Sequence, residues 1–188
     1  MPDRTCEAAV FTMLAILLAG LPVAAPIARA QTEVKSRSFP GASGLAVPRF
    51  VSVKSSRVNM RKGPGTEYPT VWVYRRAGMP LEVIKEFEGW RQVRDADGAT
   101  GWVLQSFLSG RRTALVLPWE IEEGVKAPHV ALRMDDHESA SPVAMVEAGV
   151  VANLSSCDGS WCRVNIDRYR GYIEQKKLWG VYENERIN

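Results

Sequence analysis

An internal repeat constrains this sequence more than any other feature. Four short segments of residues 58–103 recur in the same order in residues 130–173, at an offset that drifts only from 72 to 70 residues. The matched pairs are Val58-Asn-Met-Arg61 with Val130-Ala-Leu-Arg133, Gly78 with Gly149, Trp90-x-x-Val93 with Trp161-x-x-Val164, and Gly101-Trp-Val103 with Gly171-Tyr-Ile173. Each copy is long enough to bury a small core of its own. The repeat therefore predicts two tandem domains of one fold.

Short strands separated by tight turns fill the first copy. Apolar and charged residues nearly alternate over Leu81–Phe87, and Trp90–Arg94 resumes the pattern after a Glu88-Gly89 turn. Asp95-Ala-Asp-Gly98 then supplies a further turn before Thr100–Leu104. A hairpin meander accounts for this pattern, so we expect an all-β chain with one small barrel in each copy.

The N-terminal residues 1–30 differ in composition from the rest. An apolar run from Ala8 to Ile27 leads to a small-residue site ending at Ala30, which is the pattern of a cleaved secretory signal peptide. Gly20 and two prolines interrupt the run, although an uncleaved anchor stays the alternative. Residues 31–49 are rich in turn formers and are expected to be a flexible leader. We therefore predict a periplasmic or secreted protein with no stable membrane insertion after cleavage.

The charge balance argues against nucleic acid as a partner. The chain carries 24 Lys and Arg against 21 Asp and Glu, a formal net charge of +3. Nucleic-acid binders usually concentrate basic residues on one face. Here the basic residues are interspersed with acids, so a solvated surface is the simpler interpretation.

Cysteine usage agrees with export. Cys6 leaves with the signal peptide, which leaves Cys157 and Cys162 as an even pair. In an oxidising compartment such a pair is expected to form a disulfide, and the turn formers between the two residues place them across a hairpin neck. A zinc or redox site is the weaker alternative, since only His129 and His137 are nearby metal-type partners. We predict no metal and no cofactor.

The first copy resembles the bacterial SH3-like domain family. The resemblance rests on Val58-Asn-Met-Arg-Lys-Gly-Pro-Gly-Thr-Glu-Tyr68, followed by Gly89-Trp90 and Gly101-Trp-Val103. The second copy, ending in Leu178-Trp-Gly-Val-Tyr182, is similar to the tandem secreted subgroup of proteobacteria. The expected domains are residues 50–110 and 126–183, joined by residues 111–125 as a linker or an extra strand and followed by a tail, 184–188.

The resemblance implies a partly open β-barrel that serves as a non-catalytic targeting module. The implied ligand is cell-envelope material, either the glycan or the peptide of peptidoglycan. The alternative is a periplasmic protein–protein adaptor or scaffold that recognises a protein or peptide. This step is an analogy, because a fold does not determine its function. The oligomeric state is not predicted.

Aromatic residues around one loop of the first copy are the candidate ligand contacts. Gly63-Pro64-Gly65 predicts a reversing loop, with Tyr68 beside it as the best candidate for an exposed contact. Trp90 and Trp102 offer stacking surfaces for sugars or short peptides, although both could instead belong to the core. Asn59 and Arg61, in the segment that leads into the loop, complete the candidate set.

The second copy departs from this pattern at the corresponding loop. Met134-Asp-Asp-His-Glu-Ser-Ala140 has no Gly-Pro-Gly and no tyrosine, so we expect it not to recognise the same ligand. We interpret the second copy as structural or divergent, with its hairpin closed by the disulfide.

Catalytic patterns are weak throughout the chain. No Gly-x-Ser-x-Gly motif occurs, and the adjacent acids Asp135-Asp136 and Glu122-Glu123 are better explained as solvated loop charges. Asp95-x-Asp97-Gly98 resembles only part of a calcium loop. A minor enzyme hypothesis centres on His137 and its acidic neighbours. We predict that the protein is not an enzyme.

Overall fold

Antiparallel strand pairing organises the part of the chain that the computed structural model describes, residues 39–188. The helices among these residues are three short 3-10 turns, and none has the length and hydropathy needed to span a membrane. The all-β class and the two tandem barrels predicted from the sequence are therefore confirmed. The predicted signal peptide, residues 1–30, lies outside the described residues.

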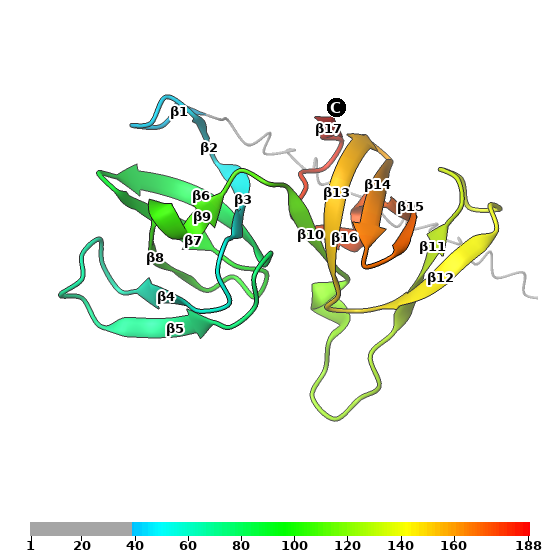
Figure 1. The fold of residues 1–188 in the computed structure, drawn as a ribbon, viewed down its shortest axis with the longest axis horizontal. Coiled ribbons are helices and arrows are strands. Elements are labelled where there is room, and N and C mark those ends of the chain that lie inside the picture. The colour runs from blue at the N-terminus through cyan, green and yellow to red at the C-terminus, as the bar shows by residue number, and fades with distance from the viewer. Residues whose placement is uncertain (1–38) are drawn as a thin grey trace, which may run out of the picture. The chain divides into compact units, whose positions relative to one another are not determined.

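The first barrel is a curled sheet of seven strands in the order β5-β4-β8-β7-β6-β3-β9, drawn from cyan to green in Figure 1. A short 3-10 helix, η1, precedes its last strand. The elements are β3 (Arg49–Val53), β4 (Val58–Arg61), β5 (Thr70–Tyr74), β6 (Pro80–Phe87), β7 (Trp90–Arg94), β8 (Thr100–Leu104), η1 (Gln105–Phe107) and β9 (Leu108–Ser109).

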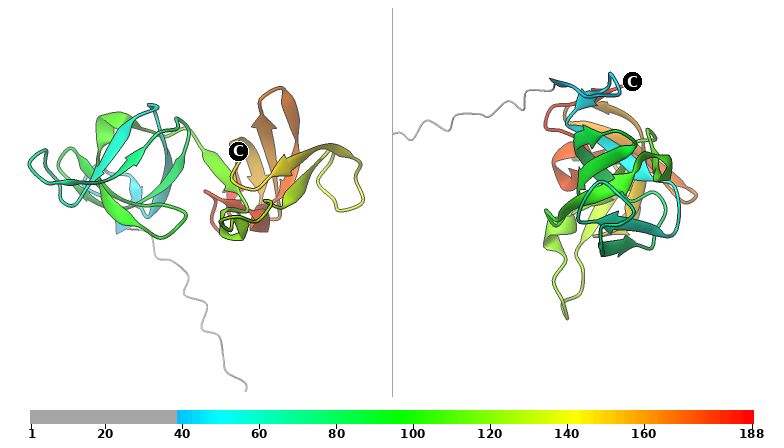
Figure 2. Two further views of the ribbon diagram at one scale, coloured as in Figure 1. Left: turned by 90° about the horizontal axis from the view of Figure 1, so that it is seen from below. Right: turned by 90° about the vertical axis from the view of Figure 1, so that its left-hand side faces the viewer.

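The second barrel, drawn from light green to red in Figure 2, repeats this order as β12-β11-β15-β14-β13-β10-β16, with β17 pairing to β13. The segment predicted as a linker or extra strand supplies β10, which pairs with both β13 and β16. The elements are β10 (Thr113–Val116), η2 (Pro118–Glu120), β11 (His129–Arg133), β12 (Pro142–Glu147), β13 (Val151–Asp158), β14 (Trp161–Ile166), β15 (Tyr169–Glu174), η3 (Gln175–Lys177), β16 (Leu178–Trp179) and β17 (Arg186–Ile187).

The sequence repeat corresponds to a repeat of local geometry. Gly78 and Gly149 both have φ at 82°, the left-handed region that favours glycine. Their amides donate equivalent hydrogen bonds, of 2.8 Å to the carbonyl of Val53 and of 2.7 Å to that of Val116. The matched glycines therefore form the turn that leads into equivalent strands, β6 in the first barrel and β13 in the second.

Alternation along the strands separates core from surface. In β4, Val58 and Met60 are buried while Asn59 is exposed, and in β11 Val130 and Leu132 are buried in the same way. Each barrel has its own cluster of buried apolar side chains. Full burial of one such side chain contributes about 2 kcal/mol. The outward positions of the same strands remain available for a binding surface.

A glycine allows each barrel to close where β8 crosses β4 and where β15 crosses β11. A Cβ on Gly101 would lie 2.4 Å from Met60 Cγ and 2.9 Å from the carbonyl oxygen of Arg61. A Cβ on Gly171 would lie 2.4 Å from the carbonyl oxygen of Arg133. Backbone atoms cannot be moved aside cheaply, so only glycine fits at these crossings.

A buried carboxylate holds the end of the leader against the first barrel. Strands β1 (Phe39–Pro40) and β2 (Ala46–Val47) form a short hairpin within the segment 31–49. Glu86, whose side chain is 1% exposed, accepts hydrogen bonds from Ser43 and Arg49 and lies 3.1 Å from Arg91 Nε. Burial would raise the pKa of Glu86, but these hydrogen bonds and the charge of Arg91 lower it to about 2.

Both barrels belong to one compact unit of the chain, and Phe50 of β3 contacts the second barrel. The Phe50 ring lies 5.1 Å from the ring of Trp179 and 4.8 Å from that of Tyr182. The Tyr182 hydroxyl also donates a hydrogen bond of 3.1 Å to Glu82. Aromatic pairs at such distances add to the stability that their burial provides.

Gly101→Ala tests whether closure of the first barrel depends on the glycine crossing. The added methyl collides with the backbone of Arg61, so the free energy of unfolding should fall by about 2 kcal/mol. Gly110→Ala is the matched control, because nothing lies within 4 Å of a Cβ at that position. Chemical denaturation measures both variants. Equal stability of the two would contradict the assigned role of the crossing.

Candidate functional site

In both barrels an arginine side chain holds the same loop by a hydrogen bond to one of its backbone carbonyls, a contact we call the loop clasp. Arg61 Nη1 donates a hydrogen bond of 2.7 Å to the carbonyl of Tyr68, and Arg133 Nη1 donates one of 2.8 Å to the carbonyl of Ala140. Each arginine sits at a β-bulge, and the register shifts directly before it. Arg61 was a candidate ligand contact from the sequence. One of its N–H donors therefore already positions the loop.

The loop closes in the same way in each barrel. The amide of Lys62 donates 3.0 Å to the carbonyl of Pro69, and the amide of Met134 donates 2.9 Å to that of Ser141. The two loops thus have equal length and equivalent ends despite their unrelated sequences. Each loop forms one side of a groove on the outer face of its barrel.

The groove of the first barrel has a volume of about 230 Å³. Three of the five candidate residues from the sequence, Asn59, Arg61 and Trp90, line it together. Its other lining residues are Arg57, Thr66, Leu104 and Phe107. Two guanidinium groups and an indole thus surround the groove, and no acidic side chain lines it.

Tyr68 and Trp102, the other two candidates, do not line this groove. Tyr68 is 40% exposed, and its ring lies against Gly63, where a Cβ would come within 2.5 Å of it. Trp102 is half-buried in β8, opposite Arg61 on the outer face of the sheet. Trp90 is also half-buried, so neither tryptophan is part of the fully buried core.

Four residues that line the groove were not predicted from the sequence, because no local motif marks them as binding residues. Arg57 precedes β4, Thr66 lies in the loop, and Leu104 and Phe107 flank the start of η1. These residues come together only through the pairing of β4 with β8. Trp90 was a candidate because it follows the Glu88-Gly89 turn and offers a stacking surface. The match of Trp90 with Trp161 in the repeat could also have indicated a second groove.

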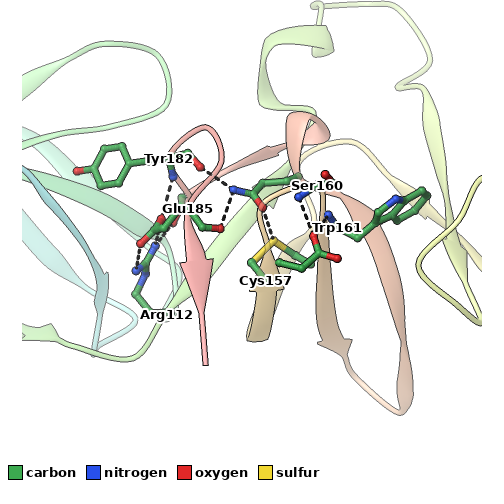
Figure 3. Close-up of a disulfide and its surroundings, with 10 residues drawn as sticks. Arg112, Cys157, Ser160, Trp161, Tyr182 and Glu185 are labelled. Carbon is green, nitrogen blue, oxygen red and sulfur yellow. Dashed lines mark hydrogen bonds and ion pairs between the residues drawn. A yellow bond between two sulfur atoms is a disulfide. The ribbon is translucent and has the colours of Figure 1, made fainter. Parts of the chain in front are cut away.

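The predicted disulfide between Cys157 and Cys162 is present and closes the β13–β14 hairpin (Figure 3). The two residues are directly paired across the strands, with their Cα atoms 4.1 Å apart. Asp158 Oδ1 accepts hydrogen bonds of 2.7 Å from the amide of Ser160 and 2.8 Å from that of Trp161. These hydrogen bonds lower the pKa of Asp158. The hairpin tip that carries Trp161 is thereby fixed.

The C-terminal segment is tied to this hairpin through Gln175. Gln175 Nε2 donates hydrogen bonds to the carbonyls of Tyr182, at 2.6 Å, and Glu185, at 3.1 Å. Its Oε1 lies 3.7 Å from the sulfur of Cys162. Arg112 donates to both carboxylate oxygens of Glu185, at 2.8 and 2.9 Å. Burial would raise the pKa of Glu185, but the Arg112 hydrogen bonds keep it low.

A second groove, of about 710 Å³, lies between this C-terminal segment, Trp161 and the loop that follows β11. Trp161 occupies the place of Trp90, and η3 occupies that of η1. The structure therefore presents the same type of groove on both barrels. The lining residues are Asp136, His137, Glu138, Gly159, Ser160, Trp161, Glu174, Gln175, Lys176, Leu178, Val181, Tyr182, Glu183 and Asn184.

Titratable groups of the catalytic hypothesis lie in this second groove. His137 is exposed on the loop, and its Nδ1 lies 3.1 Å from Ser139 Oγ. Across residues 39–188, no three His, Cys, Asp or Glu side chains lie close enough together to hold a metal ion. The arrangement of both grooves, with an indole beside charged side chains, is suited to non-covalent binding.

Comparison with known proteins identifies a family. A model described as bacterial SH3 domain matches the chain twice, over residues 54–110 and 126–180. A search of curated proteins found no match. Among solved structures, NlpC2 from Trichomonas vaginalis is similar at 14% identity and a TM-score of 0.31, over 70% of this chain and 48% of that one.

A second solved structure, an NlpC/P60 family protein from Bacillus cereus, is similar at 11% identity and a TM-score of 0.30. The similarity covers 74% of this chain and 58% of that one. The chain thus spans about half the length of these solved proteins.

Arg133→Ala tests the loop clasp. Loss of a hydrogen bond from a charged donor should lower the free energy of unfolding by about 1.5 kcal/mol. The amide of Met134, which closes the loop onto Ser141, should also exchange with solvent faster. Arg163→Ala, on the exposed side of β14, is the matched control. Unchanged exchange at Met134 in Arg133→Ala would contradict the clasp.

Proposed function

This chain belongs to the bacterial SH3 domain family, and on that basis we propose that it is an exported, non-catalytic binding module for cell-envelope material. The ligand is the glycan or the peptide of peptidoglycan, bound through the groove of the first barrel. The protein acts in the periplasm or after secretion. This function requires no cofactor and no metal.

The convergence of Asn59, Arg61 and Trp90 on one groove carries this proposal. An indole face stacks on the apolar face of a sugar ring, and the Asn59 amide provides a donor and an acceptor for its hydroxyl groups. The exposed guanidinium of Arg57 is placed to pair with a carboxylate of a wall peptide. No acidic side chain in the groove opposes an anionic group.

The shape of the groove supports a small recognition element. A volume of about 230 Å³ is smaller than most drug-binding cavities, so it fits one sugar ring or one to two peptide residues. Leu104 and Phe107, which is 42% exposed, add apolar contact. A repetitive polymer compensates for such a small contact, because many identical sites lie along it and rebinding is frequent.

A protein–protein adaptor is the second candidate, and β5 favours it. This strand ends the sheet of the first barrel, so one of its edges has no strand partner there. It exposes Val71 by 49% and Trp72 by 57%. An exposed apolar edge strand is a template for an added peptide strand.

Sedimentation of the purified, oxidised protein with isolated peptidoglycan tests the main proposal. Wild-type protein should be retained, and Trp90→Ala should weaken retention about fivefold, as expected when a stacking contact of ~1 kcal/mol is lost. Arg57→Gln, at an exposed position, should weaken it without affecting the core. Trp119→Ala is the matched control, because Trp119 is 55% exposed outside the groove.

The outcomes separate the two candidates. Equal retention of Trp90→Ala, Arg57→Gln and the control would remove the groove from the proposal. No retention of the wild-type protein would overturn envelope binding and leave the adaptor. Thermal unfolding of each variant checks that a loss of retention is not a loss of fold.

A further inference from the structure

The groove of the second barrel has an apolar floor that is largely fixed by the fold. Leu178 and Val181 are buried, and Trp161 and Tyr182 are half-buried. The disulfide and the Asp158 turn fix the position of Trp161, as described above. A floor of this kind is pre-organised, so a ligand loses less free energy in ordering it.

Exposed carboxylates form the rim above this floor. Asp136 and Glu138 come from the loop after β11, and Glu183 comes from the C-terminal segment. None of the three forms an ion pair within residues 39–188. The carboxylates therefore approach the groove from two segments that are far apart in the sequence.

The other charges at the groove, one carboxylate and two lysines, leave one positive charge. Glu174 is paired with Lys176 at 2.6 Å and is also in contact with Lys177. Burial would raise the pKa of Glu174, but the two lysines lower it. Hydrogen bonding and proximity to Glu174 raise the pKa of Lys176, with a further contribution from Glu138. The three rim carboxylates, Asp136, Glu138 and Glu183, outnumber that single positive charge, so the groove is negative overall.

The equivalent groove of the first barrel has the opposite charge. Arg57 and Arg61 line it, with no carboxylate. The two grooves thus share a tryptophan and a clasped loop but cannot favour the same ionic group. This difference in charge between the two grooves holds whichever ligand the first groove binds.

We propose that the groove of the second barrel binds a lysine-bearing segment of a protein partner. The aliphatic stem of the lysine lies over Trp161 and Val181, and its ammonium group is held by the carboxylates of Asp136, Glu138 and Glu183. A long apolar stem with a terminal cation is the complement of an apolar floor with an acidic rim. The indole face adds a cation–π contribution.

The size of the groove favours a peptide segment over a free amine. A volume of about 710 Å³ falls in the range of cavities that bury ligands much larger than one side chain. Residues on either side of the lysine can occupy the remaining length, beside Ser160 and Asn184. The partner is therefore a basic, extended segment.

Isothermal titration with acetyl-Gly-Ala-Lys-Ala-Gly-amide tests the proposal on the intact, oxidised protein. A matched peptide with Nε-acetyl-lysine keeps the stem and removes the charge. The lysine peptide should bind, and acetylation should weaken its binding about tenfold. Cadaverine, a free diamine, should bind more weakly than the peptide. Equal binding of both peptides, or tighter binding of cadaverine, would overturn the proposed occupant.

Charge variants locate the site. The triple variant Asp136→Asn, Glu138→Gln, Glu183→Gln should weaken binding of the lysine peptide about tenfold, as the loss of several exposed ion pairs implies. The triple variant Glu120→Gln, Glu122→Gln, Glu123→Gln removes the same net charge from exposed positions outside the groove and should bind normally. If both triple variants weaken binding of the lysine peptide equally, the effect comes from the overall charge of the protein, and the proposed site is wrong.

Tryptophan variants separate this inference from the function proposed for the first barrel. Trp161→Ala should weaken the lysine peptide and leave peptidoglycan retention unchanged. Trp90→Ala should weaken peptidoglycan retention and leave binding of the lysine peptide unchanged. If Trp90→Ala weakens binding of the lysine peptide instead, the amine binds in the first groove. The proposal then fails, whether or not peptidoglycan retention changes.

Discussion

The crossing of two strands at a glycine is the constraint on which each barrel depends. At Gly101 and Gly171 the backbone of one strand lies so close to the next that a Cβ would come within 2.9 Å of the carbonyl oxygen of Arg61 or 2.4 Å of that of Arg133. Strands β4 and β8, and strands β11 and β15, pair at these points, and alternate apolar side chains along β4 and β11 are buried. The same crossing places the arginine at the base of the loop, where its guanidinium clasps a carbonyl. The groove beside that loop is thus a consequence of how the barrel closes.

Much of the fold could be predicted because it depends on local and repeated features. The alternation in β4 and β11, the turn glycines and the spacing of the repeat all agree with the observed strands, and the hairpin neck correctly predicted the pairing of Cys157 with Cys162. The candidate site was harder to predict. Alternation indicates which residues face outward but not where a loop lies above them, so Tyr68 and Trp102 fall outside the groove while Arg57 and Phe107 line it. The second groove depends on Gln175 holding the C-terminal segment, a contact that no short motif encodes.

Two grooves on equivalent elements show how one scaffold can carry different recognition chemistry. The core and the clasp are shared, whereas the residues on the rim differ in charge: arginines in the first barrel, carboxylates in the second. Side chains on loops and strand ends change ligand preference at little cost to stability, because they contribute little to the core. The disulfide and the Arg112–Glu185 pair stabilise the second barrel, where the C-terminal segment forms a wall of the groove.

If the first groove binds envelope material as proposed, the Trp90 indole contacts the ligand. The most direct measurement follows the indole N–H resonances of the protein by NMR while soluble peptidoglycan fragments are added. We expect the Trp90 resonance to shift in a saturable way while that of Trp119, which is exposed outside the groove, stays in place. A saturable shift of Trp119 with no change at Trp90, or no shift at any indole, would contradict it.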